Sequence, residues 1–288
     1  MSRAPLPRNG LRAGMAEGSE TRTSTPEAIK TLLFLDLDDT VFQSQAKCRH
    51  HGMAEHTLEP AAFLESGEAH GFSTLAQRQF LRLMTQGAEI IPTTARNAAS
   101  YQRVRLAIAP PPWVILNHGG VLLDGHGQPH PLWAERMAAS LAPWLPALHA
   151  LKDEINAWAT CEAPSLYARI IGDLGQEFYL LVKDREKRHS STLPKLREAL
   201  LDAWFAAHGS QREGLFLHQN ANNLTVMPTS LDKGHAVAFL LEDYRARHPE
   251  LLVLGAGDSR SDAGFLRLCD YALIPRHAQL LLDLAGAP

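Results

Sequence analysis

The chain contains few cysteines and no long hydrophobic run. Its 288 residues include only three cysteines, Cys48, Cys161 and Cys269, which lie far apart and form no CxxC pair. This spacing does not suit a disulfide framework and favours a reducing compartment. No apolar run reaches the ~18 residues expected of a membrane span. We therefore expect a cytoplasmic protein without a membrane partner.

The chain also lacks an excess of positive charge. Its formal net charge is −3 at pH 7, whereas a nucleic-acid-binding domain usually carries a basic face. We therefore expect no nucleic-acid partner. A chain of this length can bury the core of one elaborated domain or of two modest ones. Residues 1–28 are rich in Arg, Pro, Gly, Ser and Thr and lack the apolar core of a secretory signal, so we interpret them as a disordered tail.

Strands and helices alternate in the rest of the chain, apart from one long interruption. The run 31–35 is apolar or β-branched without polar alternation, as in a strand buried on both faces of a parallel sheet. The other predicted elements are a helix at 73–86, strands at 88–94 and 113–116, a helix at 232–247, a strand at 251–254, a helix near 262–268 and a strand at 271–274. This order predicts an α/β fold with a Rossmann-like doubly wound parallel sheet. Residues 41–71 show no clear pattern, and we expect an irregular segment that forms either a flap or a loose loop.

The interruption runs from about residue 124 to 227. It contains a helical stretch at 134–158 broken near Pro143 and Pro146, strand-like runs at 166–171 and 177–183, a helix at 193–207, and strand-like runs at 215–218 and 223–227. Helix, two strands, helix, two strands describes a small α+β module with an antiparallel sheet. We therefore expect a core of residues 29–123 and 228–288 and an inserted cap domain of residues 124–227.

The first predicted strand ends in three clustered carboxylates, Asp36, Asp38 and Asp39. In open α/β sheets ligands bind at the carboxyl edge of the strands, and carboxylates crowded there repel one another unless a divalent cation neutralises them. A turn or helix cap is the alternative, but a cap needs one Asp and not three. One carboxylate can attack phosphorus to form an aspartyl-phosphate, while a second protonates the leaving oxygen and then deprotonates water.

Three further polar segments lie at strand ends or helix starts of the outer domain. Thr94 and Arg96 follow the second strand, where a hydroxyl and backbone N–H groups can hold phosphoryl oxygens, or can cap a helix. Lys233 begins a helix and can balance a nucleophilic carboxylate, although many such lysines are surface residues. Asp258 and Asp262 offer oxygen ligands suited to Mg²⁺, or cap an ordinary loop.

The order of these segments is more specific than any one of them. The segments are Asp36-Leu37-Asp38-Asp39-Thr40, Thr94-Ala95-Arg96, Lys233-Gly234 and Gly257-Asp258 through Asp262. In this order they resemble the four motifs of the haloacid dehalogenase-like phosphatases, over roughly residues 30–288. The insertion resembles the cap of the subgroup that includes sucrose-phosphate, trehalose-phosphate and mannosyl-3-phosphoglycerate phosphatases and the eukaryotic type of phosphomannomutase. Asp39 and Ala95 stand where glycine is frequent, and Ser261 stands where asparagine is usual.

The resemblance implies a role for each motif residue. Asp36 would be the nucleophile and Asp38 the general acid and base. Thr94 and Lys233 would hold the phosphoryl group.

Mg²⁺ is the cofactor that the resemblance implies. The Asp36 carboxylate, the Asp38 backbone carbonyl and Asp258 would bind it, with Asp262 nearby as a further acid. We also expect Arg96 and Asn117 at this edge of the sheet to contact the substrate.

Together these features predict a Mg²⁺-dependent phosphatase that hydrolyses a small phosphorylated metabolite, with sugar phosphates as the first candidates. The motifs do not separate this activity from that of a phosphomutase, which returns the phosphoryl group to a sugar. A catalytically silent binding module of the same fold is a third alternative. The polar cap residues that we expect to face a substrate are Arg169, Lys183, His218, Asn220 and Asn222.

Overall fold

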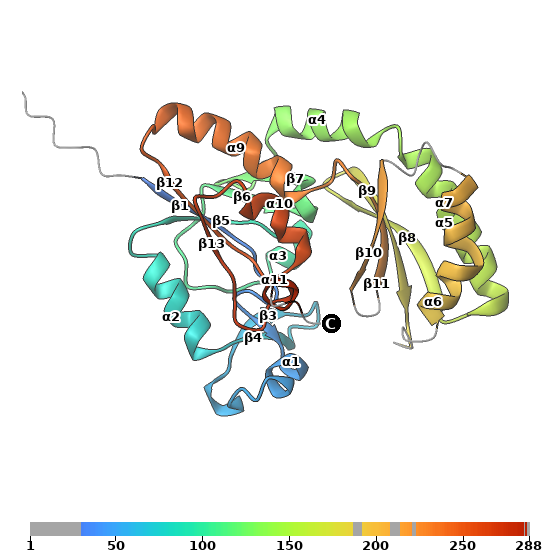
Figure 1. Cartoon of the computed structure of the whole chain (residues 1–288), viewed down its shortest axis with the longest axis horizontal. Helices are drawn as coiled ribbons and strands as arrows, with labels where there is room; N and C mark the ends of the chain where they lie inside the picture. The colour runs from blue at the N-terminus through green and yellow to red at the C-terminus, as the bar shows by residue number, and fades with distance from the viewer. Residues whose placement is uncertain (1–29, 187–191, 208–213, 221–222, 285, 287–288) are drawn as a thin grey trace, which may run out of the picture.

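A computed structural model of the chain describes residues 30–186, 192–207, 214–220, 223–284 and 286. It contains a parallel sheet flanked by helices and, beside it, an antiparallel sheet with helices on its outer face (Figure 1). The tail predicted at residues 1–28 lies outside the described residues. Among the helices that are described, none is long and apolar enough to cross a membrane.

The parallel sheet forms as predicted, with strand order β13-β12-β1-β5. Its strands are β1 (Thr31–Leu35), β5 (Glu89–Pro92), β12 (Leu252–Ala256) and β13 (Tyr271–Leu273). A parallel bridge between Thr93 and Ile115 places β6 (Trp113–Leu116) beyond β5, and β6 forms an antiparallel hairpin with β7 (Val121–Asp124). The first strand is thus central, with a parallel neighbour on each side.

Helices cover both faces of this sheet, and alternate side chains of β1 pack against the helices on opposite faces. Leu32 and Phe34 belong to one hydrophobic cluster with Leu240, whereas Leu33 belongs to another with Leu81. The helices around the sheet are α2 (Leu75–Met84), α3 (Ala98–Tyr101), α4 (Pro131–Leu141), α9 (Lys233–Arg247), α10 (Ala263–Leu266) and α11 (Gln279–Leu284). The predicted doubly wound architecture is therefore confirmed.

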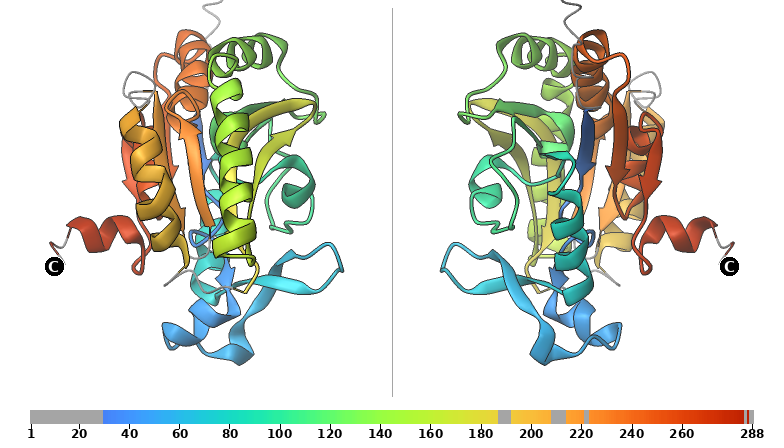
Figure 2. Two further views of the ribbon diagram at one scale, coloured as in Figure 1. Left: turned by 90° about the vertical axis from the view of Figure 1, so that its right-hand side faces the viewer. Right: turned by 90° about the vertical axis from the view of Figure 1, so that its left-hand side faces the viewer.

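Residues 41–71 are not irregular, and this prediction was wrong. The segment contains β2 (Gln43–Ser44), α1 (Gln45–His50), a single 3-10 turn at Glu55–Thr57, β3 (Glu59–Phe63) and β4 (Ala69–Ser73). The strands form an antiparallel sheet of order β2-β4-β3, and the β3–β4 hairpin extends from the molecule (Figure 2, light blue). We call residues 43–73 the flap. A Cβ on Gly71 would lie 2.8 Å from the Phe42 ring, so a glycine permits the close packing of β4 on Phe42.

The inserted module has its own antiparallel sheet, of strand order β10-β11-β9-β8. Its elements are α5 (Leu145–Glu162), β8 (Leu166–Asp173), β9 (Gln176–Asp184), α6 (Thr192–Leu196), a π turn at Arg197–Leu201, α7 (Asp202–Ala207), β10 (Leu215–Asn220) and β11 (Asn223–Pro228). Leu180 and Val182 of β9 pack against the helices of the module. Phe178 and Tyr179 belong instead to the cluster around the parallel sheet, so the second face of this sheet is turned towards the core (Figure 1).

The predicted helical stretch at 134–158 forms two helices separated at residues 142–144, close to the expected break. α4 begins earlier than predicted, at Pro131, because proline suits the first turn and the His130 side chain accepts a bond from the Trp133 amide. Trp133 and Met137 of α4 pack in the cluster around the parallel sheet, whereas Leu148 of α5 packs in the module.

Candidate functional site

The four motifs meet at the carboxyl edge of the parallel sheet. Leu35 lies beside Pro92 of β5 and beside Ala256 of β12. The residues that follow these three strand ends therefore leave the sheet at the same edge, as expected for parallel strands. Lys233, the first residue of α9, reaches the same place from a helix start capped by the Asp232 side chain.

A buried network of charged side chains occupies this edge. Lys233 Nζ lies 2.7 Å from Asp36 Oδ1 and 2.7 Å from Asp262 Oδ1. The Thr40 hydroxyl donates a hydrogen bond of 2.7 Å to Asp36 Oδ2. Lys233 is 3% exposed, Asp36 4% and Asp262 0%, so the cation and both carboxylates interact where water screens them little.

The pKa values of Asp36 and Lys233 are both raised in this network. Burial raises the pKa of Asp36, and the attraction of Lys233 offsets this only in part, because Asp262 adds a second negative charge. Burial opposes the charged form of Lys233, but its two carboxylate neighbours outweigh that effect and raise its pKa. Lys233 therefore remains a cation at every pH at which the protein would work.

Three carboxylates are close enough together to hold a metal ion. Oxygen atoms of Asp36, Asp258 and Asp262 all lie within 4.8 Å of one another. Burial, together with the charges of Asp36 and Asp262, raises the pKa of Asp258 to about 8. A divalent cation that binds here reduces the repulsion among these carboxylates, and Mg²⁺ prefers carboxylate oxygens. The donor set therefore fits Mg²⁺.

Asp262 differs from the other two in how many donors it accepts from, four against two for Asp36. Its Oδ1 accepts from Lys233, while its Oδ2 accepts from the Asp258 amide, the Ser259 amide and the Ser259 hydroxyl at 2.9–3.1 Å. The Ser261 hydroxyl bonds to that of Ser259 at 2.8 Å. Asp36 and Asp258 are thus the carboxylates with more room for a metal ion, and Asp262 orients the loop that carries Asp258.

Asp38 points away from the buried network and pairs with Arg96. The guanidinium donates two bonds of 2.7 Å, from Nε to Asp38 Oδ2 and from Nη2 to Oδ1, and its centre lies 5.2 Å from the centroid of the Phe42 ring. The next residue, Asp39, has φ 64°. This left-handed conformation explains why glycine is frequent at this position, and Asp is among the residues that tolerate it.

Thr94 and Asn117 lie at the same edge but are already engaged. The Thr94 hydroxyl is buried and accepts a bond of 3.2 Å from the Arg96 amide. The Asn117 side-chain amide donates to Asp173 Oδ2 at 2.8 Å, and the Ala98 amide donates to the same oxygen at 2.7 Å. Asn117 therefore connects the core to the β8–β9 hairpin of the inserted module, while its Oδ1 is buried and finds no partner among the described residues.

Sequence reasoning missed His118, which lies between the core and the inserted module. Its ring centroid is 5.8 Å from that of Tyr179 and 6.4 Å from that of His218. Burial, with the positive charge of Lys233, lowers the pKa of His118 to about 3, so its imidazole is neutral near pH 7. Its place directly after Asn117 was the only signal in the sequence.

Of the polar cap residues that were expected to face a substrate, His218 reaches the core through this contact. Arg169 is exposed, and Lys183 is partly buried, on strands β8 and β9 of the module. Asn222 lies outside the described residues, and the Asn220 side chain is not described.

Comparison with solved structures finds similar folds at low sequence identity. The C-terminal domain of trehalose-6-phosphate phosphatase from C. albicans is 15% identical, with a TM-score of 0.50, and the match covers 83% of this chain and 73% of that one. The sucrose-phosphatase of Synechocystis sp. PCC6803 is 15% identical, with a TM-score of 0.49 and coverage of 90% and 88%. A haloacid dehalogenase-like hydrolase from Bacteroides thetaiotaomicron is 12% identical, with a TM-score of 0.49 and coverage of 89% and 92%.

No protein-family model and no curated protein matches the chain. At 15% identity, the likeness to the C. albicans domain shows the fold. The resemblance that the motifs carry is therefore confirmed at the level of the fold.

Proposed function

We propose that the protein is a Mg²⁺-dependent phosphatase that hydrolyses a small phosphomonoester through an aspartyl-phosphate on Asp36. One observation carries this proposal. The Asp36 carboxylate is buried between the Lys233 ammonium and the Thr40 hydroxyl, each at 2.7 Å, and has further carboxylates within 4.8 Å. A nucleophile fixed beside a cation and a metal-binding donor set suits phosphoryl transfer better than it suits a structural core.

In the first step, an Asp36 oxygen attacks phosphorus, and the bond from phosphorus to the leaving oxygen breaks. Lys233 stabilises the negative charge of the phosphoryl oxygens, and Asp38 gives a proton to the leaving oxygen. In the second step, Asp38 takes a proton from a water molecule that attacks phosphorus. The bond to Asp36 then breaks and releases phosphate, so that both residues return to their starting states.

Asp36 and Asp258 would hold Mg²⁺, with the backbone carbonyl of Asp38. When bound, the ion neutralises the negative charge of the phosphoryl group. Asp262 orients the Asp258 loop through the bonds to the amides of Asp258 and Ser259.

The ion pair between Asp38 and Arg96 has a consequence for this reaction. A carboxylate held by two bonds from a guanidinium is in its charged form, whereas a general acid must carry a proton. Asp38 therefore leaves Arg96 and takes up a proton from water before it protonates the leaving group, and Arg96 acts as a positioning residue for Asp38 rather than as a contact of the phosphoryl group.

Sugar phosphates are the first substrates to examine. The C. albicans domain of similar fold is a trehalose-6-phosphate phosphatase, and the inserted module faces the site through His218 and Tyr179 as a substrate-covering cap would. A hexose phosphate also separates hydrolysis from the phosphomutase alternative. Release of free phosphate supports hydrolysis, and an isomeric sugar phosphate without phosphate release contradicts it.

The proposal is tested by phosphate release from p-nitrophenyl phosphate and from a panel of sugar phosphates, with Mg²⁺ and with a chelator. We expect activity with Mg²⁺ only, and a loss of roughly 10³-fold or more in Asp36→Asn. Asp243→Asn is the matched control, because Asp243 is exposed on α9 and pairs with Arg247 one turn away. Equal activity of Asp36→Asn and the wild type excludes Asp36 as the nucleophile. Equal activity with the chelator excludes the metal dependence.

A further inference from the structure

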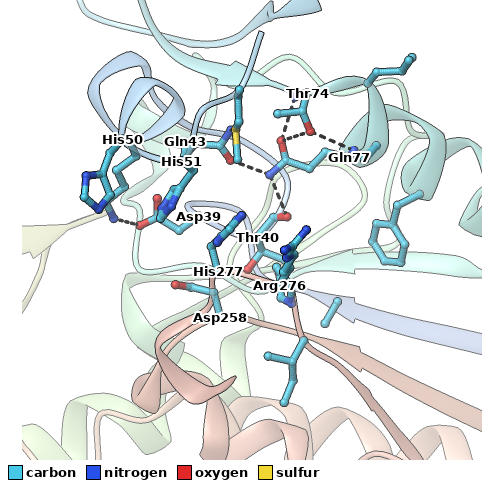
Figure 3. A pocket seen from close by; sticks show the side chains of 18 of the residues that line it. Asp39, Thr40, Gln43, His50, His51, Thr74, Gln77, Asp258, Arg276 and His277 are labelled. Atoms are coloured by element: carbon cyan, nitrogen blue, oxygen red, sulfur yellow. Dashed lines mark hydrogen bonds and ion pairs between the residues drawn. The ribbon is translucent and has the colours of Figure 1, made fainter. Parts of the chain in front are cut away.

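A cavity of about 890 Å³ lies on the side of the site formed by the flap. Its walls come from the flap, from α2 and from the segment that follows β13, and Figure 3 shows the side chains around it. None of the described residues of the inserted module lines it. Small-molecule sites have volumes of about 300–1,000 Å³, so this cavity has the size of a complete ligand site.

The cavity borders the candidate catalytic carboxylates. Thr40 and Asp258 are part of its wall, and the Thr40 hydroxyl is bonded to Asp36. The Gln77 side-chain amide fixes this wall by donating to the Thr40 carbonyl at 3.2 Å and to the Gln43 side chain at 2.7 Å. A ligand that fills the cavity therefore ends within reach of Asp36.

The chemistry of the remaining walls is mostly apolar, with one available cation. Apolar side chains cover most of the surface, namely Met53, Leu75, Phe80, Leu273, Ile274 and Leu282. Within the described part of the chain, Lys47 pairs with Asp39, whereas no carboxylate pairs with Arg276. His51 of the flap stacks on His277, with ring centroids 4.2 Å apart, and so links the two sides of the cavity.

We propose that this cavity, and not only the face of the inserted module, binds the leaving group of the substrate, and that this group has an apolar ring or chain and a further anionic substituent. The apolar walls suit the ring or chain, and Arg276 suits the anion. The identification of the ligand as a substrate rests on the proposed phosphatase activity. The existence of the binding site does not.

The binding site is tested first without catalysis, by fluorescence titration with anilinonaphthalene sulfonate, which combines apolar rings with an anion. Ala76 lies on the exposed face of α2 and lines the cavity, so Ala76→Trp places a large ring there and replaces none of the carboxylates. Gln79 is exposed on the same helix and does not line the cavity, so Gln79→Trp is the matched control. We expect Ala76→Trp to weaken binding about tenfold or more and Gln79→Trp to change it by less than about twofold.

A second pair of variants tests the anionic part of the proposal. Arg276→Met should also weaken binding of the probe, whereas Arg267→Met, an exposed arginine outside the cavity, should not. If Ala76→Trp binds the probe as tightly as the wild type, the proposal is overturned.

The identity of the ligand as a leaving group is tested by hydrolysis of naphthyl phosphate and glycerol phosphate. We expect Ala76→Trp to lower the ratio of kcat/KM for naphthyl phosphate to that for glycerol phosphate about tenfold or more, because only the naphthyl group extends into the cavity. An unchanged ratio overturns the assignment of the leaving group. If the wild type hydrolyses no phosphomonoester, the proposed phosphatase function fails, while the probe titration still decides whether the cavity is a ligand site.

Discussion

At the scale of single residues, the electrostatics of the site depend on one buried cation. Lys233 lies 2.7 Å from the carboxylates of both Asp36 and Asp262. Without this cation two buried carboxylates would face each other, and a buried charge that loses its partner destabilises a fold strongly. Lys233 therefore contributes to folding as well as to the proposed chemistry.

We expect Lys233→Met to lower the free energy of unfolding of the metal-free protein by about 3–5 kcal/mol at pH 8. The loss should be smaller at pH 5, because burial raises the pKa of Asp36 to about 7, so that this carboxyl is then protonated and no longer repels Asp262. Urea denaturation at the two pH values measures both effects.

Lys30→Met is the control for this change. Lys30 pairs with Glu89 at 2.9 Å in a partly exposed position, so its loss should cost about 1 kcal/mol or less. A loss for Lys233→Met that is equal at both pH values, or no larger than that of the control, contradicts the electrostatic role.

His118 should make the free energy of unfolding fall as the pH is lowered. Its pKa is about 3 in the folded protein and about 6.5 in an unfolded chain. The unfolded state therefore binds a proton first, and stability that is present above pH 6.5 is lost as the pH falls towards 3. The loss at pH 5 is at most about 2 kcal/mol, and smaller because part of the residue is in contact with water.

The variant His118→Asn removes the titrating group and keeps a residue that tolerates φ 56°. We expect its unfolding free energy to fall less between pH 7 and pH 5 than that of the wild type. An identical fall in the two proteins would show that His118 titrates normally in the folded state.

Residue pairings were the part of the site that the sequence could not predict. The positions of Asp36, Asp258 and Asp262 at one edge followed from strand order, because parallel strands end together. The ion pair of Asp38 with Arg96 depends on the rotamers of two side chains 58 residues apart, and no local pattern reports that contact.

At the scale of elements, a carboxylate of the β8–β9 hairpin accepts two hydrogen bonds from the core. Asp173, at the end of β8, accepts from the Asn117 side chain and from the Ala98 amide. We expect Asp173→Ala to lower the free energy of unfolding by about 1–3 kcal/mol, because both donors lose their partner. Thermal or urea denaturation measures it.

Asp153→Ala is the control for the hairpin, since Asp153 is largely exposed on α5 and pairs with the adjacent Lys152. Its effect should be within about 0.5 kcal/mol. If the two variants lose equal stability, the hydrogen bonds of Asp173 contribute no more to the free energy of unfolding than the exposed ion pair of Asp153 does.

The strands and the helix of the flap were not predicted from the sequence. Strand β2 has only two residues, and the β3–β4 pairing is interrupted by register shifts. Such strands lack the repeated alternation that sequence reading requires. Their order comes from tertiary contacts such as the packing of β4 against Phe42, which a local pattern does not contain.

At the scale of the whole molecule, the succession of strands and helices was sufficient to predict the core and the insertion. A continuous apolar run predicts a buried strand, and an amphipathic pattern predicts a helix, as β1 and α2 illustrate. The sequence did not indicate that a cavity of about 890 Å³ lies on the side of the flap. The position of a cavity depends on how whole elements pack.

Metal binding should stabilise the whole molecule. Mg²⁺ at about 100 times its dissociation constant contributes about 2.7 kcal/mol, which corresponds to a rise of about 5 °C or more in Tm for a chain of this size. We expect calorimetry to show this rise for the wild type and for the control Asp243→Asn. Asp258→Asn should lose most of it, because one carboxylate of the cluster is gone. An equal rise in Asp258→Asn would place the metal elsewhere.

The central claim is that Asp36 carries the phosphoryl group, and trapping this adduct tests it most directly. In Asp38→Asn the water that releases phosphate lacks its base, while p-nitrophenol is a leaving group that needs little protonation. With Mg²⁺ and p-nitrophenyl phosphate, this variant should release one p-nitrophenol per molecule in a burst. Peptide mass analysis after acid quenching should then find one phosphoryl group on Asp36. A phosphoryl group on another residue, or the same burst after Asp36→Asn is added, would contradict the account.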